Sequence, residues 1–114
     1  KQARLGGKNI EGILGTEQDP KLPKGQVDAV LMVDVYHEFA YPFEMMMAIH
    51  KSLSPDGKVY LVEYRGEDPK VPIKPRHKMT AEQAIREMEA AGLAFVKNLT
   101  VLPRQHLLVF ELKK

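Results

Sequence analysis

The sequence predicts a three-layer α/β fold with a mostly parallel sheet and a closing antiparallel hairpin. Strand-like and helix-like segments alternate along the 114 residues, which is typical of sheets whose parallel strands are joined by helices. The strand-like segments are almost continuously apolar, as strands are when both faces of a sheet are covered. One chain of this length forms one domain or part of one.

The amino-terminal quarter is predicted to hold one strand between less regular segments. Lys1 to Gly7 ends in a glycine pair, which is typical of the last turn of a helix. Asn9 to Leu14 is predicted to be a short strand. Gly15 to Gly25 contains two X-Pro steps and is predicted to be a turn-rich loop.

The middle of the chain carries the strongest signals. Val27 to Val35 is predicted to be a buried strand because its centre is entirely apolar. Pro42 suits the first turn of a helix, and four apolar residues fall on one face of that helix: Phe43, Met46, Ile49 and Leu53. Ser54 to Gly57 is expected to end the helix in a turn, and Lys58 to Tyr64 to form a second buried strand.

The carboxyl-terminal part is predicted to contain a helix and a hairpin. Arg65 to Met79 is rich in proline and is predicted to be a long loop. Thr80 and Gln83 have the spacing of a capping box, which predicts a helix that begins there. Leu93 to Leu102 and Gln105 to Leu112 are predicted to be antiparallel strands, because only two residues separate them.

The composition excludes several classes of protein. The absence of cysteine excludes a disulfide scaffold, a zinc-thiolate site and a thiol nucleophile. The longest apolar run is far shorter than a membrane span requires, and no signal peptide is visible, so we expect a cytoplasmic protein. A net charge of +2 without a basic stripe argues against nucleic-acid binding. The four histidines are too widely spaced to indicate a metal site.

Three short motifs, in this order and spacing, resemble the second half of class I S-adenosylmethionine-dependent methyltransferases. They are Val27-Asp28-Ala29-Val30, Asp34-Val35-Tyr36-His37-Glu38 and Leu53-Ser54-Pro55-Asp56-Gly57-Lys58-Val59. The resemblance covers residues 8 to 112 and implies a Rossmann-like sheet, S-adenosylmethionine as cofactor, and methyl transfer to a small-molecule acceptor. A receiver domain and a dinucleotide-dependent oxidoreductase fit less well, because their acidic cluster and glycine fingerprint are absent.

The sequence departs from that family in two places. Pro55-Asp56-Gly57 stands where the family has Pro-Gly-Gly, which is a mild change because Asp tolerates turn conformations. More severely, the family's glycine-rich loop and ribose-binding acid have no counterpart here. We therefore expect residues 1–114 to be a partial domain that binds the cofactor weakly or not at all and is inactive alone. The alternative is a non-catalytic α/β fragment that oligomerisation stabilises.

The resemblance also implies a set of cofactor-binding residues. Ligands of open α/β sheets bind beyond the carboxyl ends of the strands. Thr16 and Glu17, next to Gly15, would lie near the adenine amino group, and the backbone of Val33 and Asp34 would lie beside the cofactor. An ordinary polar turn is the alternative interpretation of the first segment.

Candidate substrate and catalytic residues follow the two buried strands. The resemblance implies that Tyr36 or His37 faces the substrate, and His37 is the best-placed titratable group to act as a general base. Its alternative role is to begin the next helix. Glu63 and Tyr64 are further substrate-binding candidates, although a structural ion pair of Glu63 with Arg65 or Lys74 is the alternative.

The same resemblance predicts how the chain assembles. In that fold the strand Val27 to Val35 lies in the middle of the sheet, and one of its two neighbouring strands is not in this sequence. An apolar strand edge with unpaired backbone groups recruits another strand. We therefore expect a homodimer through the edge of residues 27–35, with inward movement of the strand Asn9 to Leu14 as the alternative.

Overall fold

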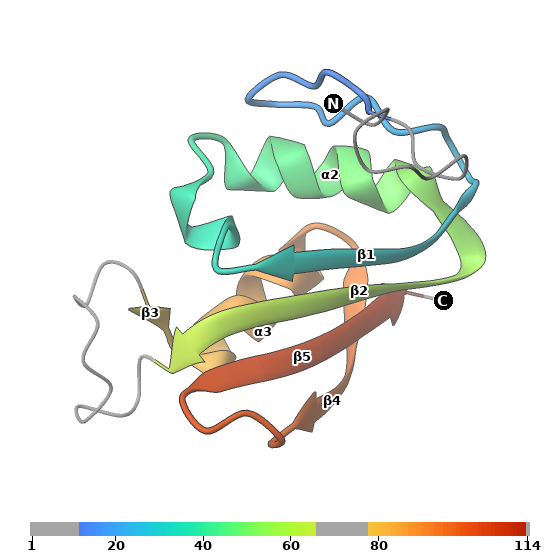
Figure 1. The fold of residues 1–114 in the computed structure, drawn as a ribbon. Coiled ribbons are helices and arrows are strands. Elements are labelled where there is room, and N and C mark those ends of the chain that lie inside the picture. Colours follow the sequence, from blue (N-terminus) through green and yellow to red (C-terminus); the bar gives the residue numbers. More distant parts are fainter. Residues whose placement is uncertain (1–11, 66–77, 114) are drawn as a thin grey trace, which may run out of the picture.

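The computed structural model describes residues 12–65 and 78–113, which form one mixed sheet and two helices (Figure 1). In chain order the elements are β1 (Val27–Val33), the 3-10 turn η1 (Tyr36–Glu38), α2 (Pro42–Ser52), β2 (Leu53–Arg65), β3 (Lys78–Met79), α3 (Ala81–Ala90), β4 (Leu93–Leu99) and β5 (Gln105–Leu112). The sheet runs β1-β2-β5-β4, and β3 pairs with the end of β2. The predicted α/β fold with a closing hairpin is confirmed.

The two apolar strands β1 and β2 are parallel neighbours. Val30 is opposite Val59 and Met32 is opposite Leu61, so these four side chains share the face that becomes the core. β5 runs antiparallel to β2, and β4 runs antiparallel to β5. The carboxyl ends of β1 and β2 therefore lie side by side at one edge of the sheet.

Both helices begin where the sequence indicates. Pro42 occupies the first turn of α2, where its missing N–H removes no hydrogen bond. The Gln83 N–H donates to Thr80 Oγ1 at 3.1 Å, so Thr80 is the N-cap of α3 as its spacing to Gln83 predicts. Each helix thus starts at a position that local chemistry specifies.

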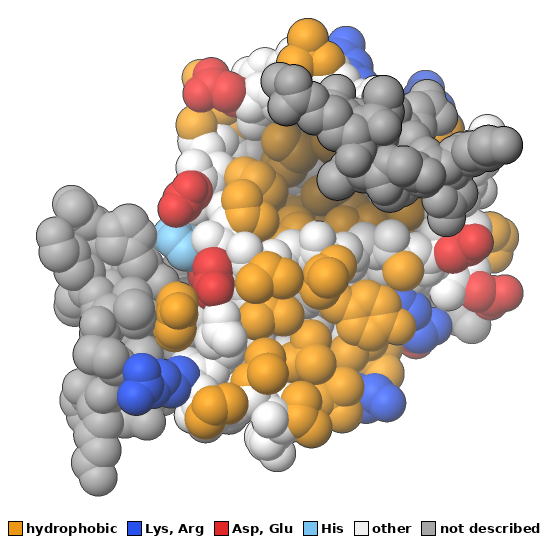
Figure 2. Space-filling view, viewed as in Figure 1, with side chains coloured by type: hydrophobic (Ala, Val, Ile, Leu, Met, Phe, Trp, Pro, Cys, Tyr) orange, Lys and Arg blue, Asp and Glu red, His pale blue; other side chains and the backbone are white. Residues whose placement is uncertain are grey.

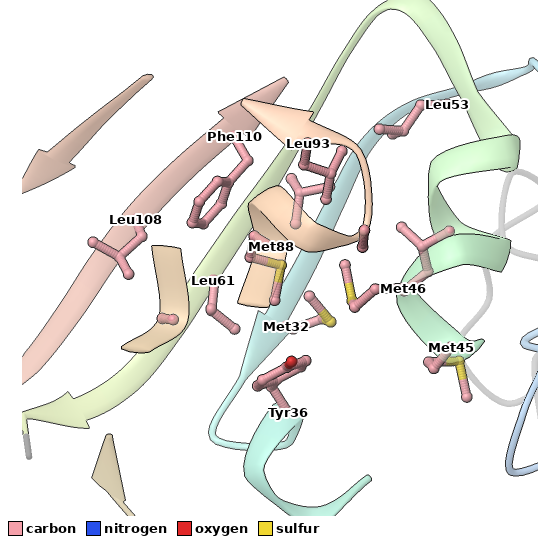
Figure 3. Close-up of a cluster of buried hydrophobic side chains, with 14 residues drawn as sticks. Met32, Tyr36, Met45, Met46, Leu53, Leu61, Met88, Leu93, Leu108 and Phe110 are labelled. Atoms are coloured by element: carbon pink, nitrogen blue, oxygen red, sulfur yellow. The ribbon is translucent and has the colours of Figure 1, made fainter. Parts of the chain in front are cut away.

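Buried side chains of α2 and α3 meet on one face of the sheet (Figure 3). Met46 from α2 and Met88 from α3 approach each other above Met32 of β1 and are 1% and 0% exposed. The remaining cluster members shown there include Leu61, Leu93, Leu108 and Phe110. Thioethers are flexible enough to fill the irregular space between two helices and a twisted sheet.

The opposite face of the sheet is apolar and open within the described residues. Figure 2 shows hydrophobic side chains gathered over the sheet on the side away from α3. Leu31 and Val33 of β1 point to this face and are 66% and 51% exposed. Exposed apolar side chains that are contiguous on one face are uncommon in isolated monomers.

Three local predictions differ from the structure. Residues 12–14 are irregular, so the expected strand Asn9 to Leu14 is wrong for its described part, while its first residues and Lys1 to Gly7 lie outside the described residues. Ser54 to Gly57 belongs to β2, where it forms a register shift opposite β1. Lys78–Met79 forms a short strand that pairs with β2, within the segment expected to be a loop.

No described helix has the length and apolar character that crossing a membrane requires.

Candidate functional site

Asp34 directly follows β1 and has an unusual backbone conformation. Its φ is 54°, in the left-handed region that few residues other than glycine adopt and that costs on the order of 1 kcal/mol. Two hydrogen bonds hold it there. Its N–H donates to Val62 O at 2.8 Å, and its Oδ2 accepts from Gln105 Nε2 at 2.7 Å.

Glu63 is the most deeply buried carboxyl group at this end of the sheet, with 1% of the residue exposed. Its Oε2 accepts from the Tyr36 backbone N–H at 3.0 Å. Its Oε1 lies 2.6 Å from His37 Nδ1. Of the two partners that the sequence suggested as an alternative for Glu63, Lys74 and the side chain of Arg65 lie outside the described part of the chain; the contact that the structure describes is with His37. Burying a carboxylate is tolerated because both oxygens have hydrogen-bond partners.

The contact with Glu63 fixes the chemistry of the His37 ring. Because a carboxylate accepts hydrogen bonds, the neutral ring carries its proton on Nδ1 and its lone pair on Nε2. Nε2 lies 3.6 Å from Glu38 Oε2, and 10% of the His37 side chain is exposed. Figure 2 shows a histidine flanked by acidic groups near the end of β1. The arrangement is that of a base oriented by a buried acid.

Tyr36 has a structural position beside this pair. Its ring is buried in the core, where 4% of the residue is exposed. Its hydroxyl donates to Glu87 Oε1 of α3 at 2.6 Å. Burial first, then the hydrogen bond to Glu87 and the negative charges of Glu87 and Glu63, raise the pKa of Tyr36 well above its usual value. Its predicted contact with a substrate stays a prediction.

The loop before β1 and the segment after β1 line a shared pocket. The pocket has a volume of about 500 Å³ and is lined by Gly15, Thr16, Glu17, Glu38, Phe39, Ala40 and Met45. The pocket thus brings together the three predicted residues of the first stretch, whereas the predicted residues after β1 (Val33, Asp34, Tyr36 and His37) are not among its lining residues. Thr16 is already engaged, because its Oγ1 accepts from the Asp19 N–H at 3.1 Å. The Glu17 carboxylate is therefore the better candidate for contact with a ligand.

The pocket fits one end of S-adenosylmethionine. Phe39 and Met45 supply apolar surface for a flat ring, and Glu17 supplies an acceptor for an exocyclic amino group. Gly15 is in a tight turn, where an added Cβ would lie 2.8 Å from Pro20 Cα. The described lining offers partners for one end of such a cofactor only, so the fit is partial.

Two predicted residues and two unpredicted ones also lie near this end of the sheet. Val33 ends β1 with a side chain on the open face, and Tyr64 is half-buried opposite Gln105. Sequence reasoning missed Gln105 and Glu87, which hold Asp34 and Tyr36. The first of these contacts joins residues 71 apart, and no local pattern in the sequence signals it.

Comparisons with known proteins support the fold. No protein-family model and no curated protein matches the chain. A SAM-dependent methyltransferase from Aquifex aeolicus matches in structure with 19% identity and a TM-score of 0.83, over 95% of this chain and 57% of that one. A putative type 11 methyltransferase from Sulfolobus solfataricus matches with 18% identity and a TM-score of 0.74, over 89% of this chain and 57% of that one.

A third match is the trans-methyltransferase CalH in complex with SAH, with 14% identity and a TM-score of 0.76. The match covers 97% of this chain and 38% of that one. This chain therefore spans little more than half the length of the first two proteins and less of the third. Its fold is that of part of a Rossmann-like methyltransferase domain, which confirms the predicted resemblance at the level of the fold.

Proposed function

We propose that the chain provides part of an S-adenosylmethionine-dependent methyltransferase that acts on a hydroxyl group of a small molecule. The observation that carries this proposal is the 2.6 Å contact between His37 Nδ1 and the buried Glu63 carboxylate. A hydroxyl is a weak nucleophile and gains most from a base, whereas a thiolate or an unprotonated amine needs little more than positioning. The fold supports methyl transfer in general, and the His37–Glu63 pair supports this class of acceptor.

The proposed chemistry uses the two nitrogens of His37 in different ways. When bound, the cofactor supplies a methyl group on a positively charged sulfur, which makes that carbon electrophilic. With the cofactor and an acceptor bound, His37 Nε2 would be the atom that accepts the proton of the acceptor hydroxyl. Glu63, which holds Nδ1–H, orients the ring and stabilises the imidazolium that results.

Cofactor contact is proposed at the pocket of about 500 Å³. Glu17 would accept from the adenine amino group, while Phe39 would pack on the ring. The backbone of Val33 and Asp34 would lie beside the remainder of the ligand. Because only one end of the ligand finds described partners, we expect affinity in the millimolar range, on the order of −4 kcal/mol.

Nuclear magnetic resonance titration with S-adenosylhomocysteine tests the pocket. Backbone amides of residues 15–17 and 38–40 should shift at millimolar ligand, and Glu17→Gln should reduce the shifts. Val101→Ala, a change at a distant exposed residue, should leave them unchanged. Shifts confined to other regions, or none at all, would contradict the assignment. Micromolar affinity measured by isothermal titration would contradict the expectation of weak binding.

Turnover tests the role of His37. In a polypeptide that carries the complete activity, His37→Ala should lower kcat about a hundredfold or more while changing cofactor affinity little. Glu63→Gln should lower kcat as well, because it changes the tautomer of the ring. Unchanged turnover in both variants would remove the pair from the mechanism, and positioning alone would then explain transfer.

A further inference from the structure

We propose that a small pocket between α2 and α3 binds an organic cation of the alkylammonium class, with the Glu87 carboxylate as its counter-ion. The pocket has a volume of about 200 Å³ and is lined by Tyr36, Pro42, Phe43, Glu87 and Ala90. It shares no lining residue with the pocket that Glu17 lines. Pockets for whole drug-sized molecules measure about 300–1,000 Å³, so this one suits a compact group. The proposal does not depend on the function proposed above.

Glu87 brings a negative charge to this pocket, and both hydrogen bonds that it accepts come from neutral groups. Its Oε1 accepts from the Tyr36 hydroxyl at 2.6 Å, and its Oε2 accepts from Gln83 Nε2 at 3.0 Å. Among the side chains that the structure describes, the carboxylates in ion pairs are those of other residues: Glu38, Glu63, Glu82 and Glu111. A half-buried carboxylate whose charge no described neighbour balances attracts a cation.

The end of α3 adds negative potential to the pocket. α3 ends at Ala90, and its last turn contains no basic residue. The last carbonyl groups of a helix carry partial negative charge, which a cation stabilises. Lys113 Nζ donates to Glu89 O at 3.2 Å, but Lys113 is not among the lining residues. The first turn of α2 has the opposite polarity, and it carries an acidic residue, Glu44.

Two aromatic rings face the same space. The helical pattern placed Phe43 on the buried face of α2, yet 53% of it is exposed. The Tyr36 ring lies at the margin of the buried cluster in Figure 3. Aromatic faces attract cations, and Pro42 and Ala90 contribute apolar surface. Since both oxygens of Glu87 already accept hydrogen bonds, methyl groups around a charged nitrogen fit this lining better than several N–H donors would.

Nuclear magnetic resonance titration with choline tests the site. The backbone amides of Phe43, Glu87 and Ala90 should shift and saturate at millimolar choline, the affinity expected for a ligand of so few atoms. The alcohol 3,3-dimethyl-1-butanol has the same shape without the charge and should bind about fivefold more weakly. Sodium chloride keeps the ionic strength constant, because salt screens contacts between charges.

Three variants assign the binding to the proposed residues. Glu87→Gln removes the charge but keeps an oxygen that accepts from the Tyr36 hydroxyl, so it should fold and bind choline about fivefold more weakly. Phe43→Ala, at an exposed ring, should weaken binding by about twofold or more. Glu82→Gln is the matched control, because it removes a charge from the same helix at a side chain that is 91% exposed and outside the pocket; its affinity should equal that of the native chain.

Four results would overturn the proposal. They are the absence of saturable shifts up to about 100 mM choline, shifts confined to residues 15–17 and 38–40, equal affinity for choline and its neutral analogue, and unchanged choline affinity in a folded Glu87→Gln variant.

Discussion

Replacing Glu63 by glutamine should change the tautomer of His37 with little loss of stability. The Tyr36 N–H requires an acceptor, and it lies 3.0 Å from Glu63 Oε2. The glutamine carbonyl oxygen is therefore held on that side. The amide nitrogen, a donor, then faces His37 Nδ1. Because two donors cannot share this contact, the neutral ring must move its proton to Nε2 and lose its basic site there.

The expected losses of unfolding free energy distinguish Glu63→Gln, which changes the tautomer of His37, from Glu63→Leu, which disrupts the hydrogen bonding of the site. Glutamine retains the Tyr36 hydrogen bond and replaces a charge-assisted bond by a neutral one, which costs about 1 kcal/mol. Glu63→Leu leaves the Tyr36 N–H and His37 Nδ1 without acceptors, at about 1–3 kcal/mol each. Part of that cost is offset, since a buried charge is removed. Leucine should therefore be the more damaging substitution.

The assays are imidazole nitrogen-15 spectroscopy and urea unfolding. In the native chain, neutral His37 should show a protonated Nδ1, and in Glu63→Gln it should show a protonated Nε2. His50, which lies in α2, is the internal control and should not change. The same His37 tautomer in both proteins would refute the assigned hydrogen-bond direction. A Glu63→Leu variant as stable as Glu63→Gln would refute the energetic reasoning.

Two further predictions concern stability. Met88→Ala empties a site that is 0% exposed and should lower the free energy of unfolding in urea by about 2–5 kcal/mol, whereas Val101→Ala at an exposed site should change it by less than about 0.5 kcal/mol. The raised pKa of Tyr36 means that the folded state keeps this proton more tightly than the unfolded state, so its contribution is complete below the usual pKa of 10.0 and is lost as pH rises above it. Tyrosine usually titrates between about pH 9 and 11. Over this range the free energy of unfolding should fall less steeply with pH in Tyr36→Phe than in the native chain.

The fold was predictable because its signals are local and repeated. The apolar run of β1, the proline at the start of α2 and the Thr80 cap each specify their element within a few residues. The strand expected at residues 9–14 shows the limit of this reasoning. Its described part is irregular, since an apolar residue pattern forms a strand only where a neighbouring strand accepts its hydrogen bonds.

The sequence singled out the residues of the candidate site but not the contacts among them. The rule that ligands bind beyond the carboxyl ends of parallel strands identified Asp34, His37 and Glu63. It did not indicate that Glu63 would pair with His37, because the sequence pointed to an ion pair of Glu63 with a nearby cation instead. The contact of Gln105 with Asp34 depends on the register of β5 against β2, which only the assembled sheet defines.

Side chains from other strands hold the carboxyl end of β1, where the candidate site lies. Within the described residues, β1 is held by hydrogen bonds on one side only, and strands held in this way open more readily than central strands do. Its carboxyl end is nevertheless tied to the rest of the sheet by side chains: Gln105 holds Asp34, and Glu63 holds the backbone of Tyr36 and the ring of His37. These contacts fix the end of the strand that carries the proposed base, so the position of His37 depends on side chains from β2 and β5 and not on the hydrogen-bond ladder of β1 alone.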